Sequence, residues 1–183
     1  MALNRRKFFQ YGITGGICLA LGGLGLSMQS TKMQPVSTPL HTFSPREYSV
    51  LVAIADRMLP ENRNFPAASS LSVASKVDQM LGQAHPGLQA ELKLLLRLIE
   101  NAAAGLLLSG AFKPFSQCTA AEQNEILACW RTSRLTFRRS AIVSLNRLCG
   151  AAYYADPATH KLVGYGGPPK EVLQVQKAMK ELQ

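Results

Sequence analysis

The feature that most constrains the fold of this chain is an apolar repeat of helical period that recurs along most of its body. The first such segment, SPREYSVLVAIADRMLP at residues 44–60, opens with Ser44, Pro45 and Glu47, which form a capping box with proline at the first helical position. Pro60 marks its end. Almost no alternating strand pattern occurs in the body. The sequence therefore predicts an all-α protein.

Further helices are predicted beyond this one. Residues 72–83 carry the second, and a His-Pro-Gly turn separates it from a third over residues 88–108. The third is the longest and most apolar, so we expect it at the centre of the bundle, buried on several sides. Thr119 and Glu122 form a second capping box, after which the pattern is helical to about Tyr154. We thus expect a small irregular bundle of about five to six helices, following an amino-terminal signal or anchor helix.

The amino-terminal stretch LNRRKFFQYGITGG resembles a twin-arginine export signal. Arg5 and Arg6 precede Phe8 and Phe9 and a glycine-rich run whose hydrophobicity is mild. We predict that residues 1–30 form a twin-arginine signal or anchor that directs the protein to the periplasm, at the inner membrane. An ordinary secretory leader and an uncleaved membrane anchor remain open alternatives.

The rest of the chain divides by composition into three parts. The proline-containing polar stretch over residues 31–43 predicts a linker, and residues 44–169 are expected to form the helical domain. Residues 170–183 are predicted to form a short amphipathic helix. No internal repeat or low-complexity tract interrupts this organisation.

The net charge of +9 at pH 7 includes three leader residues, which leaves a moderate basic bias of about +6 in the body. The body lacks the dense Lys/Arg runs, interleaved aromatics and zinc spacing of a nucleic-acid module, which argues against nucleic-acid binding. Five arginines and no acidic residue lie between residues 126 and 155: Arg131, Arg134, Arg138, Arg139 and Arg147. They form either a solvated basic face or a docking face for an acidic partner.

The chain lacks the residue patterns of the common catalytic and metal sites. Its three histidines, His41, His85 and His160, are scattered over predicted loops. No Glu-x-x-His pair, His-Glu-x-x-His motif, Cys-x-x-Cys pair or Cys-x-x-Cys-His motif occurs. No glycine-rich turn joins a predicted strand to a helix. We therefore predict no catalytic residue, cofactor or metal ion in this chain, and a redox or metal enzyme is the least supported class.

Three cysteines lie in the body, at Cys118, Cys129 and Cys149. In an oxidising compartment one disulfide pair and one free thiol are expected, whereas three buried apolar thiols are the alternative. The residue pattern leaves both interpretations open.

The segment AAYYADPATHKLVGYGGPP at residues 151–169, here called the closing segment, is dense in tyrosine, glycine and proline. That composition predicts a loop, which presents side chains and backbone instead of filling a core. Tyr153, Tyr154 and Tyr165 are amphipathic anchors of the kind enriched at protein interfaces.

Taken with the leader and the helix LVAIADRMLP, the closing segment resembles the small subunit (subunit 3) of membrane-associated gluconate 2-dehydrogenase and related dehydrogenases. The resemblance covers most of residues 43–169. Its most specific parts are the helix end at residues 54–60 and a Tyr-x-Asp-Pro…Gly-Tyr-x-Gly-Pro-Pro segment. The residues that match in this second part are Tyr154, Asp156, Pro157, Gly164, Tyr165, Gly166, Pro168 and Pro169.

The resemblance implies an accessory, non-catalytic role. Such small subunits pair with a large flavoprotein of the glucose–methanol–choline oxidoreductase type, which carries FAD and oxidises an alcohol or a sugar. A periplasmic c-type cytochrome, with its haem c, often forms a third subunit. The large subunit commonly lacks an export signal, so the small one carries it across the membrane folded, with Arg5 and Arg6 recruiting the twin-arginine translocon.

On this interpretation the closing segment and the arginine-bearing helix contact the large subunit. The expected partner interface comprises Tyr153, Tyr154, Asp156, Pro157, Gly164, Tyr165, Gly166, Pro168, Arg134 and Arg138. The alternative is a membrane-tethered periplasmic helical scaffold without a flavoprotein partner. The sequence does not specify the partner's substrate or whether the leader is cleaved.

Overall fold

The computed structural model describes residues 31–36, 38–59, 64–101, 113–167, 169 and 172. Within these ranges the chain forms six α-helices, two short 3₁₀ helices and no strand, which confirms the expected all-α fold. The elements are α2 (Pro45–Met58), α3 (Val73–Gly82), α4 (Pro86–Glu100), η1 (Phe115–Gln117), α6 (Ala120–Arg131), α7 (Thr136–Tyr154), α8 (Pro157–His160) and η2 (Lys161–Val163). None of the described helices combines the length and apolar character needed to cross a membrane. The predicted leader and the predicted amphipathic helix over residues 170–183 lie outside the described ranges, apart from residue 172.

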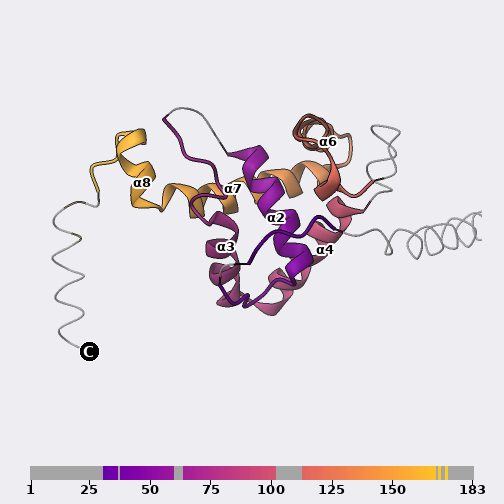
Figure 1. Ribbon diagram of the computed structural model, residues 1–183, viewed down its shortest axis with the longest axis horizontal. Coiled ribbons are helices and arrows are strands. Elements are labelled where there is room, and N and C mark those ends of the chain that lie inside the picture. Colours follow the sequence, from indigo (N-terminus) through magenta and orange to yellow (C-terminus); the bar gives the residue numbers. More distant parts are fainter. Residues whose placement is uncertain are drawn as a thin grey trace, which may run out of the picture.

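Helix α2 is the central element of the bundle. It packs against α3, α4, α6, α7 and η1, and in Figure 1 it lies between α3 and α4 and in front of α7. Its capping box forms as predicted, because Ser44 accepts from the backbone N–H of Glu47 and the Glu47 carboxylate accepts from that of Ser44 at 2.9 Å. Leu51 and Ile54 are completely buried. Each such side chain contributes roughly 1.5–3 kcal/mol to folding.

The prediction that the helix beginning near residue 88 is central was wrong. This helix, α4, ends at Glu100 because Asn101 adopts an extended backbone, and residues 102–112 lie outside the described ranges. Only one narrow side of α4 is buried, through Leu92, Leu96 and Ile99, whereas Leu94 is 67% exposed. The leucines of α4 are therefore distributed around the helix, and their number overstates how much of its surface is covered.

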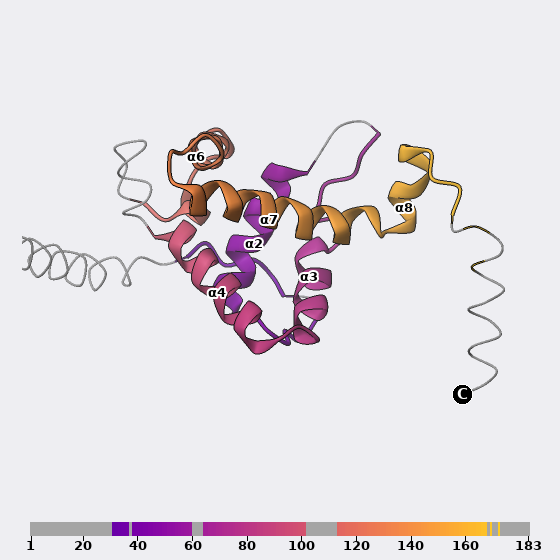
Figure 2. The same cartoon turned by 180° about the vertical axis from the view of Figure 1, so that it is seen from behind.

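The predicted continuous helix from residue 119 to Tyr154 is divided in two. The Thr119–Glu122 capping box begins α6 as expected, but α6 ends at Arg131 and α7 begins only at Thr136. Figure 2 shows α7 running along the described domain from the α6 side to α8. The break places α6 against the start of α7, so that the two helices pack on each other.

Residues 31–36 and 38–43 of the predicted linker lie against the domain and are here called the amino-terminal strap. The backbone N–H groups of His41, Thr42 and Phe43 all donate to the carboxylate of Asp78 in α3, at 2.6, 3.0 and 2.8 Å. Asp78 is buried, and so are Thr42 and Phe43. A buried carboxylate is stabilised when several donors surround it. The strap therefore belongs to the folded domain.

Candidate partner interface

The closing segment is largely helical, contrary to the expectation of a loop. Helix α7 continues to Tyr154, after which α8 and η2 follow directly. The Asp-Pro pair starts a helix: the Asp156 side chain accepts from the backbone N–H of Ala158 at 2.8 Å, and Pro157 occupies the first turn. Gly164 ends η2 with φ of 71°, a conformation that favours glycine.

Asp156 positions α8 against the rest of the domain. Its carboxylate forms an ion pair with Lys76 of α3, with 2.5 Å between Oδ2 and Nζ. The hydrogen bond from Lys76, followed by that from the backbone of Ala158, holds the pKa of Asp156 below its usual value. The hydroxyl of Thr159, which is completely buried, donates to the backbone carbonyl of Asp156 at 2.8 Å. The Asp156 carboxylate thus already has its partners, Lys76 and the backbone of Ala158, within this chain.

Tyr153 lies in the core, so the expectation that it is presented at the surface was wrong. Its side chain is 0% exposed and its hydroxyl donates to the carbonyl of Pro66 at 2.7 Å. Burial, and next the neighbouring Tyr154, raise the pKa of the phenol. The helical register explains this placement, because Tyr153 follows the buried Cys149 by four residues on the same face of α7.

Four large apolar side chains are exposed at this end, and they are here called the carboxy-terminal patch. It consists of Tyr154, Leu162, Val163 and Tyr165. Tyr165 is 48% exposed, and its ring stands edge-on to His160 with 5.0 Å between centroids. Its backbone N–H donates to the His160 carbonyl at 2.9 Å, which fixes the chain after Gly164.

Two residues of the carboxy-terminal patch, Leu162 and Val163, were not predicted as site residues. They belong to no apolar periodic run, and only the turn of η2 exposes them. Of the other predicted residues, Pro157, Gly164 and Gly166 are exposed at this end, whereas Pro168 lies outside the described ranges.

The two predicted arginines, Arg134 and Arg138, lie in a second region, residues 130–139, here called the α6–α7 elbow. Arg138 covers the ring of Trp130, with its guanidinium carbon 5.4 Å from the ring centroid, and Phe137 meets the same ring edge-on at 6.2 Å. Trp130 itself is almost completely buried, whereas Arg134 is exposed. Sequence analysis did not predict Trp130 or Phe137 here, because the break between α6 and α7 brings them together.

The predicted interface therefore falls into two separate parts. Arg138 lies near the start of α7 and Tyr154 at its end, which corresponds to about 24 Å along the helix axis. Figure 2 shows the elbow on the α6 side and α8 at the opposite end of α7. A single small contact cannot include both regions.

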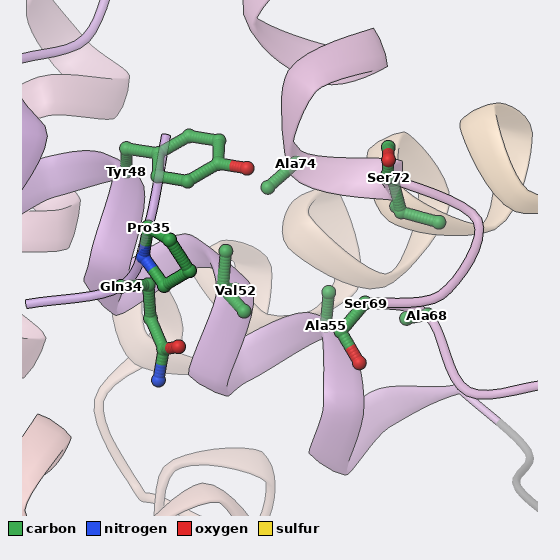
Figure 3. Close-up of a pocket in the computed structure, with 10 residues that line it drawn as sticks. Gln34, Pro35, Tyr48, Val52, Ala55, Ala68, Ser69, Ser72 and Ala74 are labelled. Carbon is green, nitrogen blue, oxygen red and sulfur yellow. The ribbon is translucent and has the colours of Figure 1, made fainter. Parts of the chain in front are cut away.

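A small cavity of about 150 Å³ lies between the amino-terminal strap, α2 and α3. Figure 3 shows Tyr48 and Val52 of α2 facing Ala74 of α3 across it, with Pro35 of the strap beside Tyr48. The Tyr48 hydroxyl and Ser75 Oγ are 3.1 Å apart and hydrogen-bonded. The lining of the cavity contains no acidic, basic, histidine or cysteine side chain. This lining supplies no pair of groups for acid–base or nucleophilic chemistry.

The described residues also contain no group of three or more histidine, cysteine or acidic side chains placed to hold a metal ion. The three body cysteines are unpaired: Cys118 and Cys149 are buried and Cys129 is partly buried. Burial raises the pKa of the Cys149 thiol to about 12. Two of the three cysteines thus agree with the buried-thiol interpretation.

The fold and these surfaces describe a small helical domain whose distinctive features are exposed patches. Its sequence matches the family model of gluconate 2-dehydrogenase subunit 3 over residues 45–167. The chain belongs to this family, as its motifs predicted. The match extends from the first residue of α2 into the closing segment, and the family name describes a subunit of a dehydrogenase complex. No curated protein and no solved structure matches the chain significantly.

Proposed function

We propose that this chain is the non-catalytic small subunit of a periplasmic FAD-dependent alcohol or sugar dehydrogenase of the gluconate type. It supports the twin-arginine export, maturation and stability of the flavoprotein subunit. The observation that carries the proposal is the family match across residues 45–167, which includes every helix described above.

In this proposal Arg5, Arg6, Phe8 and Phe9 recruit the twin-arginine translocon, and the leader brings the complex to the inner membrane. The partner is a flavoprotein of the glucose–methanol–choline type that receives FAD in the cytoplasm and crosses the membrane folded. A c-type cytochrome with haem c is the expected third subunit. Both cofactors belong to the partners.

The carboxy-terminal patch is the contact surface that we assign to the flavoprotein. Tyr154 and Tyr165 are exposed aromatic residues on a supported segment, since the Lys76–Asp156 ion pair precedes α8 and the hydrogen bond from the Tyr165 N–H to the His160 carbonyl follows it. An obligate interface of this kind buries more than about 2,000 Å². Tyr153 and Asp156 act by positioning the patch.

The test is affinity purification of the full chain from membranes and periplasm of its host, followed by an absorption spectrum of the material that accompanies it. A co-purifying large subunit with the absorption bands of oxidised flavin supports the proposal. The variant with both Arg5 and Arg6 changed to Lys should leave that subunit in the cytoplasm. A colourless monomer would instead favour the tethered scaffold.

The interface is tested with Tyr165→Ala in the same purification. Loss of an aromatic anchor should weaken the complex by about 2 kcal/mol. Leu94→Ala, which changes an exposed apolar residue on α4, is the control and should leave the complex intact. Equal capture with Tyr165→Ala and wild type would show that the carboxy-terminal patch is not the contact surface.

A further inference from the structure

The α6–α7 elbow contains two buried hydrogen-bond donors that have no acceptor among the described residues. These donors are Nε1 of Trp130 and Nε of Arg138. Buried polar groups in folded proteins are almost always paired, and a charged donor is especially costly to leave unpaired. The elbow therefore differs from the rest of the core, in which buried polar groups are expected to be hydrogen-bonded.

The elbow segment itself is basic, and no described ion pair involves it. No acidic residue lies between residues 126 and 155, and none of the three ion pairs in the described part of the chain reaches the elbow. Arg139 is engaged locally, since it donates to the carbonyl of Ser133 and the hydroxyl of Thr136. Nε of Arg138 has no acceptor among the described residues.

A solvated basic face explains Arg138 poorly. The exposed Arg134 and Arg147 can direct all their donors into water, whereas Nε of Arg138 is shielded from solvent. Contact with the Trp130 ring holds the guanidinium in one place, which lowers the entropy lost when it is paired. The apolar side chains of Leu135 and Phe137, each about half exposed, belong to the same elbow.

We propose that the elbow is a second docking site for the large subunit and that it takes an acidic polypeptide segment. A carboxylate of that segment pairs with the guanidinium of Arg138, and a neighbouring apolar side chain packs against Leu135 and Phe137. A guanidinium matches a carboxylate in charge and in its forked geometry. The identity of the partner rests on the proposed function, whereas the carboxylate preference rests on the elbow alone.

The first test uses Trp130, which is the only tryptophan of the chain and therefore reports on the elbow through its fluorescence. The full chain in mild detergent is titrated with a short synthetic peptide rich in glutamate and leucine. The same peptide with glutamine in place of glutamate is the control. We expect a saturable change with the glutamate peptide that weakens with added salt, and at least about tenfold weaker binding of the glutamine peptide.

The matched variants are Arg138→Gln and Arg147→Gln. Both remove one positive charge from α7, but Arg147 is exposed and lies about 13 Å further along the helix. Arg138→Gln should weaken binding of the glutamate peptide by about tenfold or more, and Arg147→Gln by less than about twofold. Equal binding by Arg138→Gln and wild type, or equal binding of the two peptides, would overturn the site.

The second test compares Arg138→Glu with Arg147→Glu in capture of the flavoprotein from the host. Arg138→Glu should retain much less flavoprotein than Arg147→Glu. As a folding control, both variants should have the melting temperature of the wild type. Capture by wild type and Arg138→Glu alike overturns the second docking site and leaves the proposed function standing. Absence of flavoprotein with the wild type contradicts the proposed function, and the peptide titration still decides the chemistry of the elbow.

Discussion

The two ends of α7 differ in how completely their polar groups are satisfied. At the α8 end, Asp156 pairs with Lys76 and caps α8, and the Tyr153 hydroxyl has a carbonyl acceptor. At the α6 end, Trp130 and Arg138 each retain a buried donor that no described residue pairs. One end is therefore completed by contacts within the chain, and the other keeps donors that no described residue satisfies.

The largest expected effect is at the satisfied end. Tyr153→Ala removes a completely buried aromatic side chain together with its hydrogen bond, and it should lower the free energy of unfolding by about 3–5 kcal/mol. Denaturant unfolding followed by circular dichroism measures the change. Tyr154→Ala, at the adjacent exposed position, is the control and should cost less than about 1 kcal/mol. Similar losses for the two variants would remove the distinction between them.

Asp156→Ala should have the next largest effect. It removes the cap of α8 and leaves Lys76 without its ion-pair partner, and we expect a loss of about 1–2 kcal/mol. Asp156→Asn keeps capping ability while it removes the charge, so the difference between the two variants separates the cap from the ion pair. If the free energy of unfolding of Asp156→Ala equals that of the wild type, neither the cap of α8 nor the ion pair with Lys76 contributes to stability.

Arg138→Met should change stability in the opposite direction. The substitution retains an apolar stem over Trp130 and removes the unpaired buried donor, so the isolated chain should gain about 1 kcal/mol. The exposed Arg134→Met is the control, with an expected change within about 0.5 kcal/mol. Thermal unfolding compares the two. A loss of stability with Arg138→Met would contradict the unsatisfied state of the elbow.

The smallest effect concerns pH. Hydrogen bonds from Lys113 and then from Thr119 lower the pKa of Glu122 from 4.5 to about 2 in the folded chain. Because the folded pKa is the lower one, the stabilisation from Glu122 is complete above the unfolded pKa and is lost as the pH falls toward the folded value. Thermal unfolding of wild type and Glu122→Gln between pH 6 and about pH 2 should therefore converge at the acid end. If the unfolding temperatures of wild type and Glu122→Gln differ by a constant amount across this pH range, ionisation of Glu122 does not contribute to stability.

Patterns among neighbouring residues were sufficient to predict several elements of the fold. The capping boxes at Ser44–Glu47 and Thr119–Glu122 form where the sequence predicts them, because each involves groups only three residues apart. Helical register places Tyr153 on the face of Cys149, so its burial was predictable from the helix that the sequence extends to about Tyr154.

Other features depend on groups that are distant in the chain. Asp78 gathers donors from the strap more than thirty residues earlier, and Lys76 pairs with Asp156, which is 80 residues away. The contact of Arg138 with Trp130 requires the break between α6 and α7. No local pattern encodes such meetings, since they depend on how helices pack.

By itself the sequence determined the helical class, the two capped helix starts and the family motifs, because helical period, capping and motif spacing are properties of neighbouring residues. Only the tertiary structure decided that α2 is central, that Tyr153 is internal while Tyr154 is exposed, and that the elbow retains unpaired donors. The physical reason is that burial and hydrogen-bond satisfaction depend on which surfaces pack together across the whole chain.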